Sequence, residues 1–148
     1  MTKRPESVLV VVYTASEAVL LLQRRDHPDF WQSVTGSLEI DESKGDAALR
    51  ELYEETGLSE ASGVLFDCHL ANWFEIYPQW RHRYGANVTQ NLEHVFSFVI
   101  PQEIPITLSH EHLAYRWLAK EEALKVASSS SNQTAIKTFV RRDYGRSQ

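Results

Sequence analysis

The chain has 148 residues and a formal net charge of −5, with 43% hydrophobic and 24% charged residues. This length suffices for one domain with a substantial core but not for two ordinary ones, so we predict a single domain over residues 1–148. The composition is typical of a soluble globular protein and, with no apolar run near the ~20 residues that span a bilayer, argues against a membrane protein. A mildly acidic chain without a long basic tract also argues against a general nucleic-acid binder.

The cysteine count and the N-terminal residues bear on location. Cys68 is the only cysteine, so no intrachain disulfide can form, and the first residues lack the pattern of a secretory signal. We therefore predict a cytoplasmic protein. Because no heptad or surplus apolar segment indicates assembly, we also predict a monomer.

The first elements in chain order are predicted strands. Residues 8–13 and 19–22 are apolar runs with many β-branched residues, a pattern typical of strands covered on both faces. Residues 24–33 carry charge, a proline and two aromatic residues, which predicts a loop. A short strand at 33–35 follows.

A helix is predicted next, over residues 44–56. Ser43 can cap its first turn, and Asp46 stands three residues later in the position of a capping box. Gly57 follows the last predicted turn and is expected to end the helix.

The second half of the chain predicts more strands and two helices. The strands are expected at residues 64–73, 92–100 and 114–118. Residues 77–91 predict an exposed excursion, and helical patterning returns at 120–127 and 132–142. The serine run 128–131 between the helices is either a flexible linker or, through Ser131, the N-cap of the last helix. The mixture predicts an α/β fold in which a mixed β-sheet is sandwiched between α-helices.

Negative charge is concentrated in one short stretch. Residues 36–58 contain seven acidic and two basic residues, which leaves 13 acidic and 13 basic residues in the rest of the chain. This stretch thus holds the whole formal charge of −5. Such a concentration predicts a cation site.

The acidic helix presents its carboxylates together. Glu51, Glu54 and Glu55 lie three and four positions apart and share one face, while Ala48 and Leu52 can pack toward the core. Crowded oxygen ligands favour a hard divalent ion, and Mg²⁺ in particular is bound by few carboxylates together with water and phosphates. For the carboxylates alone, a solvated acidic helix face is the alternative.

The order of residues in this stretch identifies a family. Gly36, five residues, Glu42, seven residues and then Arg50 to Leu58 form a complete Nudix box, and the chain resembles a Nudix hydrolase. The resemblance implies the Nudix fold and a metal-dependent pyrophosphohydrolase that uses Mg²⁺, with Mn²⁺ as a substitute. It implies that the box loop and helix present metal to a diphosphate.

Roles for the box residues follow from this resemblance. Glu51 and Glu55 are the expected principal metal ligands, and Glu54 is either a third ligand or a group that positions water. Arg50 precedes Glu54 by four residues and can hold that carboxylate through its planar fork. Gly36 lacks a Cβ, which permits close approach to its backbone.

Outside the box the chain resembles one subfamily, the bacterial dihydroneopterin triphosphate pyrophosphatases of folate biosynthesis. The segments that carry this resemblance are 22–26, 28–36, 74–77, 81–84, 111–118 and 131–132. The subfamily releases diphosphate from a small-molecule triphosphate and leaves the monophosphate. Matching positions imply substrate contacts by Lys3, Arg24, Thr35, Phe74, Glu75, Ile76, Tyr77 and Ser129, and a further metal ligand and catalytic group at Glu111.

These residue types suit a pterin triphosphate. Lys3 and Arg24 offer positive charge to phosphates, and Phe74 can stack on a flat heterocycle while Glu75 or a main-chain group accepts its ring hydrogens. Ordinary core packing is the alternative for Phe74 and Tyr77, and a solvated terminus is the alternative for Lys3.

Glu111 stands between two histidines, which raises the alternative of a zinc site. Strand alternation points His110 and His112 to one side and Glu111 to the other, so a single carboxylate that reaches a hard metal is favoured. Glu111 could also act as a general base.

Two other functions compete with this prediction. The first is a Nudix pyrophosphatase that acts on (deoxy)nucleoside triphosphates, because purines and pterins share much of their hydrogen-bonding outline. The second is a catalytically silent Nudix module that only binds a ligand, although the box keeps all three helix carboxylates.

Overall fold

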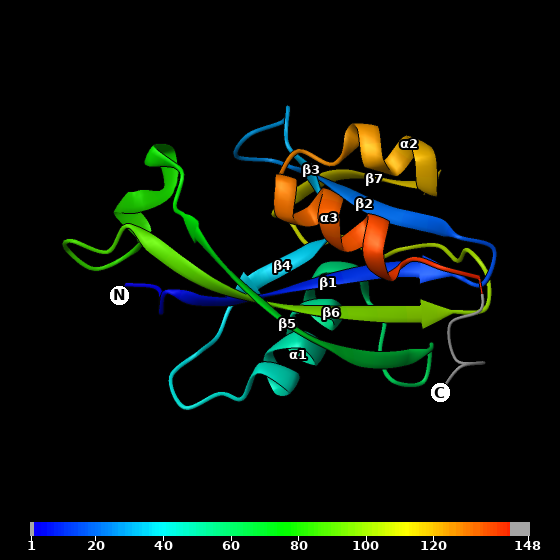
Figure 1. The fold of residues 1–148 in the computed structure, drawn as a ribbon, viewed down its shortest axis with the longest axis horizontal. Coiled ribbons are helices and arrows are strands. Elements are labelled where there is room, and N and C mark those ends of the chain that lie inside the picture. Colours follow the sequence, from blue (N-terminus) through cyan, green and yellow to red (C-terminus); the bar gives the residue numbers. More distant parts are fainter. Residues whose placement is uncertain (1, 143–148) are drawn as a thin grey trace.

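The computed structural model describes residues 2–142, in which helices pack on both sides of a β-sheet (Figure 1). The elements are β1 Glu6–Thr14, β2 Ala18–Arg24, β3 Trp31–Gln32, β4 Val34–Ser37, α1 Lys44–Thr56, β5 Val64–Glu75, the 3₁₀-helix η1 Pro78–Arg83, β6 Gln90–Ile100, β7 His112–Ala119, α2 Lys120–Val126 and α3 Ser130–Phe139. All predicted strands and helices are present with shifts of a few residues at their ends, and η1 lies in the predicted excursion.

The strands of the described region form one mixed sheet around β1. β1 runs parallel to β6 and antiparallel to β2 and β4, while β5 pairs with β6 and β7 pairs with β2. Residues 8–13 of β1 are at most 2% exposed, because helices cover both faces of the sheet. This confirms the strand predicted there.

Two hydrophobic cores lie on opposite faces of the sheet, and Figure 1 shows α1 on one side with α2 and α3 on the other. Val8, Val10 and Val12 of β1 pack toward α1, where Ala48 and Leu52 are fully buried as predicted. Leu9 and other odd-numbered residues of β1 pack toward α2 and α3. We refer below to the α1 face and the α3 face of the sheet.

The ends of α1 follow the sequence prediction. Ser43 is the N-cap and its hydroxyl oxygen accepts a hydrogen bond of 3.2 Å from the backbone N–H of Asp46. Gly57 ends the helix with a φ of 78°, a left-handed conformation that glycine adopts without steric cost.

The start of the last helix corrects the prediction. The N-cap of α3 is Ser129, whose hydroxyl accepts from the backbone N–H of Asn132 at 3.2 Å, so the assignment of Ser131 as the cap was wrong. Ser129 has the extended backbone that a cap requires. The helix also ends at Phe139, three residues before the predicted end at 142.

The serine run is fastened to the sheet, and the linker alternative is therefore wrong. Ser128 accepts at its hydroxyl from the backbone N–H of Trp31 and donates its own N–H to the Trp31 carbonyl, both at 2.9 Å. Asn132, fully buried, accepts from the backbone N–H of Ser33 at 2.8 Å and donates its side-chain amide to the Ser33 hydroxyl at 2.9 Å. These bonds fix the start of α3 against the segment between β3 and β4.

Within residues 2–142, no helix combines the length and the apolar character needed to cross a membrane.

Candidate active site

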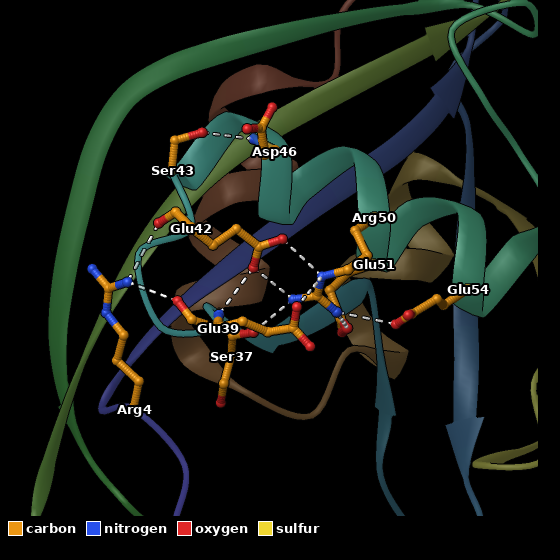
Figure 2. Close-up of polar contacts among 9 residues, drawn as sticks. All are labelled: Arg4, Ser37, Glu39, Glu42, Ser43, Asp46, Arg50, Glu51 and Glu54. Carbon is orange, nitrogen blue, oxygen red and sulfur yellow. Dashed lines mark hydrogen bonds and ion pairs between the residues drawn. The ribbon is translucent and has the colours of Figure 1, made fainter.

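Arg50 is the centre of the polar network on α1 (Figure 2). Its guanidinium donates two bonds of 2.8 Å to Glu42, one of 2.7 Å to Glu51, one of 3.1 Å to Glu54 and one of 3.0 Å to the Ser37 carbonyl. The predicted pair with Glu54 is thus confirmed, and it is one of several. The hydrogen bonds to Arg50 lower the pKa of Glu42, and those carboxylates raise the pKa of Arg50. Arg50 remains charged and ties the loop after β4 to the helix.

Gly36 gives Glu51 its place against the sheet. A Cβ on Gly36 would lie 1.5 Å from Oε2 of Glu51, so any larger residue at this position would force the carboxylate to move. The predicted close approach at Gly36 is confirmed, and the group that approaches is this carboxylate. As a result Glu51 is largely buried, with 12% of its side chain exposed.

Glu55 lies one turn further along α1 and is 3% exposed. Within the described part of the chain Oε1 of Glu55 has no hydrogen-bond partner, although a backbone hydrogen bond at Thr35 favours the ionised carboxylate. Burial, followed by repulsion from Glu51 and Glu111, raises the pKa of Glu55 well above its usual range. Nε2 of His112 is 3.8 Å from Oε1, but burial lowers the pKa of His112, so a neutral imidazole is favoured there.

The ionised form of Glu51 is disfavoured for similar reasons. Burial, and then a hydrogen bond with Glu54, raises the pKa of Glu51 to about 7 despite the adjacent Arg50. Two neighbouring carboxylates on α1 are thus both disfavoured as anions. A cation among them would remove this penalty.

The donor set fits a hard divalent cation. Glu51 and Glu55 could supply oxygen ligands from α1, Glu111 is close enough to repel Glu55, and the unpaired Oε1 of Glu55 offers an open lone pair. Across residues 2–142, no three carboxylate, imidazole or thiol side chains are already arranged as a metal site. Only Oε1 of Glu51 accepts from Arg50, so its second oxygen could bind a metal while that hydrogen bond holds the side chain in place.

Several predicted substrate residues already have partners within the protein. Thr35 donates its hydroxyl to the Val8 carbonyl at 2.9 Å, and the hydroxyl of Ser129 caps α3. Lys3 is exposed, and its backbone N–H donates to the Arg83 carbonyl at 2.7 Å. These contacts restrict the side chains of Thr35 and Ser129 but leave the Lys3 ammonium group exposed.

The remaining predicted residues lie at and beyond the end of β5. Phe74 is half-buried and Glu75 is exposed near Arg81, with 3.6 Å between their charged groups. Ile76 is 3% exposed, and its backbone N–H donates to the Thr89 carbonyl at 2.8 Å. Tyr77 is more open at 36% exposed. Their contacts with substrate stay predictions.

The sequence did not reveal how Arg24 is held. Its guanidinium forms two bonds of 2.8 Å to Asp26 and lies 4.1 Å from the ring centroid of Trp80. Asp26 also accepts from Arg83 at 2.7 Å, and Trp80 meets the ring of Tyr77 edge-on at 5.4 Å. The spacing of Arg24 and Asp26 was the local signal for this contact, because Trp80 and Arg83 come from the excursion. We call Arg24, Asp26, Trp80 and Arg83 the arginine clasp.

Comparison with known proteins decides the family. The family model for the NUDIX domain matches residues 3–139. The chain belongs to the Nudix hydrolase family. This confirms the predicted Nudix fold, and enzymes of the family generally use divalent metal cations.

Relatives of this Nudix hydrolase share nearly its whole length. It is 45% identical to the dihydroneopterin triphosphate diphosphatase of Haemophilus influenzae, over 93% of this chain and 89% of that protein. It is 47% identical to the enzyme of the same name from Escherichia coli, over 93% of each chain. The solved structure of the E. coli dihydroneopterin triphosphate pyrophosphohydrolase superposes with a TM-score of 0.89 and 46% identity, covering 95% of this chain and 97% of that one.

Proposed function

We propose that this Nudix hydrolase converts dihydroneopterin triphosphate into dihydroneopterin monophosphate and diphosphate, a step of folate biosynthesis. The observation that carries the proposal is 45–47% identity to enzymes of that name over 93% of the chain. A match confined to the Nudix box would support only phosphoanhydride hydrolysis. Identity that extends through both faces of the sheet supports a shared substrate as well.

We propose Mg²⁺ as the cation, with Mn²⁺ able to replace it, and Glu51, Glu55 and Glu111 as its ligands. A divalent cation at this place would neutralise phosphate charge and lower the pKa of a bound water. The chain contributes the orientation of these groups, since Arg50 and Gly36 fix Glu51.

Other residues are proposed to hold substrate or water. Glu54 is the most exposed of the helix carboxylates that contact Arg50, at 54% of its side chain, which suits a water-positioning group. Lys3 and Arg24 offset triphosphate charge, and the half-buried ring of Phe74 stacks on the pterin.

The protein is further proposed to act as a single-domain monomer in the cytoplasm, on a small molecule and without nucleic acid. Cys68 is a free thiol, which is consistent with a reducing compartment. Burial raises the pKa of this thiol to about 11, so it is unreactive.

The decisive experiment compares Mg²⁺-dependent hydrolysis of dihydroneopterin triphosphate with that of the purine deoxynucleoside triphosphates. Products are resolved as diphosphate or single phosphate, and kcat/KM is measured for each substrate. We expect preference for the pterin with release of diphosphate. Preference for a nucleotide would indicate a Nudix pyrophosphatase that acts on nucleoside triphosphates. If none of these triphosphates were hydrolysed, the protein would be a silent binding module.

A further inference from the structure

Three buried residues of β6, Asn91, Glu93 and Ser97, each have a side-chain oxygen without a hydrogen-bond partner among residues 2–142, and the first two are neighbours on the strand. Asn91 is 1% exposed and Glu93 is 6% exposed, and the oxygens concerned are Oδ1 of Asn91 and Oε1 of Glu93. The two residues are two positions apart on a strand, so they face the same side. Unpaired buried acceptors destabilise a folded protein and are uncommon. Two of them side by side require an explanation.

Both residues lie on the α3 face, away from the carboxylates of α1. Asn91 donates its amide to the hydroxyl of Ser7 at 2.6 Å, and the Glu93 carboxylate has a hydrogen-bond interaction with Ser131 of α3. Their neighbour His94 points to the opposite face, where its Nε2 is 2.6 Å from Glu6. Among residues 2–142, the side chains that form hydrogen bonds with those of Asn91 and Glu93 are thus neutral hydroxyls.

The residue proposed to stack on the pterin lies beside this pair. In the antiparallel ladder of β5 and β6, Phe74 is directly opposite Asn91, and Asn72 is directly opposite Glu93. Residues opposite one another in such a ladder share a face and touch. Phe74 and Ser131, which lie beside the pair, are both half-buried, so this part of the α3 face is accessible from solvent.

The chemistry of the pair selects a class of ligand. A carboxylate has two oxygens that only accept hydrogen bonds, so it pairs best with two adjacent N–H donors. The 2-amino-4-oxo edge of a pterin, which guanine shares, presents a ring N–H next to an amino group. Adenine presents a ring nitrogen lone pair beside its amino group, and that lone pair would repel a carboxylate oxygen.

We propose that Glu93, with Asn91 beside it, binds the amide N–H and the amino group of the substrate heterocycle and determines specificity for 2-amino-4-oxo rings. This inference rests on the proposed function only for the identity of the ring as a pterin. Burial raises the pKa of Glu93 to about 6, so the group still ionises near neutral pH and can accept both bonds. Without a ligand, the same burial disfavours the charged form.

The test is Glu93→Gln, which keeps the shape but replaces one acceptor by a donor. We expect KM for dihydroneopterin triphosphate and for dGTP to rise roughly 10- to 100-fold, the usual scale for a lost bidentate contact. We expect kcat to stay within about twofold and dATP hydrolysis to be unchanged, so the preference for guanine over adenine falls at least tenfold. Equal losses on dGTP and dATP, or no change, would overturn the proposal.

Two further variants separate contact from packing. Glu93→Asp keeps the charge but withdraws the carboxylate, and we expect it to lose the same preference. Ser97→Ala is the matched control, because Ser97 is buried on the same face of β6, four residues from Glu93. Ser97→Ala is expected to leave the preference for guanine over adenine unchanged. If Ser97→Ala lost as much of this preference as Glu93→Gln, the effect would come from altered packing and not from a lost contact.

A binding measurement distinguishes this inference from the proposed function. Dihydroneopterin without phosphates is titrated by fluorescence into wild type, Glu93→Gln and Glu55→Gln. We expect binding to wild type and Glu55→Gln and at least tenfold weaker binding to Glu93→Gln. Binding without turnover of the triphosphate would contradict the proposed function alone, whereas undiminished binding to Glu93→Gln, or none to wild type, would contradict the role of Glu93.

Discussion

Each face of the sheet contains a buried glutamate with an unpaired oxygen, and the two differ in their neighbours. On the α1 face, Glu55 is repelled by Glu51 and Glu111. On the α3 face, burial raises the pKa of Glu93 and the hydroxyl of Ser131 lowers it, and no acidic side chain of residues 2–142 contributes to the shift. The first arrangement calls for a cation and the second for N–H donors. The same residue type, equally buried, therefore selects ligands of different chemistry on the two faces.

The largest expected effect comes from Glu55→Gln, which removes charge from the α1 face alone. Loss of a metal-ligand charge costs several kcal/mol of transition-state stabilisation, so kcat is expected to fall on the order of 1000-fold. Without metal the variant is expected to be more stable than wild type at pH 7, because wild type must either take up a proton at Glu55 on folding or bury its charge, and glutamine does neither. Steady-state kinetics across a Mg²⁺ titration and thermal unfolding in chelator measure both effects. Wild-type turnover would refute the assignment of Glu55.

Gly36→Ala tests whether the position of Glu51 matters as much as its charge. The new methyl group would occupy the place of Oε2 of Glu51, while Gly36 itself has no backbone conformation that excludes alanine. We expect kcat/KM to fall roughly 10- to 100-fold with the fold retained, as for other displaced ligands.

Gly45→Ala is the control for this substitution. A Cβ on Gly45 meets nothing within 4 Å, and alanine favours a helix by up to about 1 kcal/mol over glycine. Wild-type kinetics with equal or higher stability are expected. A loss of activity in both variants would mean that any substitution of these glycines disturbs α1, and the argument from Gly36 would fail.

The two faces also differ in how far the sequence predicts them. The helix α1 and the partners of Arg50 all come from residues 36–58, so the cap at Ser43, the stop at Gly57 and the pair of Arg50 with Glu54 follow from local spacing. The α3 face draws on segments far apart in the chain, and local spacing carries no such information there.

The errors in prediction have the same origin. Four consecutive serines are chemically equivalent as caps, and the choice of Ser129 depends on the bonds of Ser128 to Trp31 and of Asn132 to Ser33. Likewise, strand alternation would place Asn91 and Glu93 on one face, but whether their oxygens are paired depends on β1 and α3.

Asn132→Ala tests the anchoring of the α3 face. The backbone N–H and hydroxyl of Ser33 would both lose their partner in a fully buried place, which costs about 1–3 kcal/mol. We expect Tm to fall by roughly 4–10 °C and KM to rise with kcat retained. Thr134→Ala, an exposed change on the same helix, should leave both quantities unaltered. A fall in kcat without a change in KM would show that α3 supports the α1 face instead.

The pH dependence of stability isolates Glu93. Its pKa of about 6 in the folded protein exceeds the ordinary value of 4.5, so folding favours the protonated form. The corresponding stability is fully present below pH 4.5 and is lost as pH rises through about 6, a change of about 2 kcal/mol between pH 4 and pH 7. Chemical unfolding in chelator should show this extra loss in wild type relative to Glu93→Gln. Parallel curves would mean that Glu93 is not disfavoured as a charge.

The smallest expected effect concerns the arginine clasp. Trp80→Leu keeps an apolar side chain but removes the ring under the Arg24 guanidinium, and a cation–π contact at such a site is worth about 0.5–1 kcal/mol. KM is therefore expected to rise about two- to fivefold for every triphosphate, because Arg24 serves phosphates rather than the heterocycle. Trp80→Phe should retain most of the affinity, and kcat should not change in either variant. A shift in preference between guanine and adenine would instead show that the clasp recognises the ring. The idea that the clasp binds phosphate while Glu93 binds the ring would then be wrong.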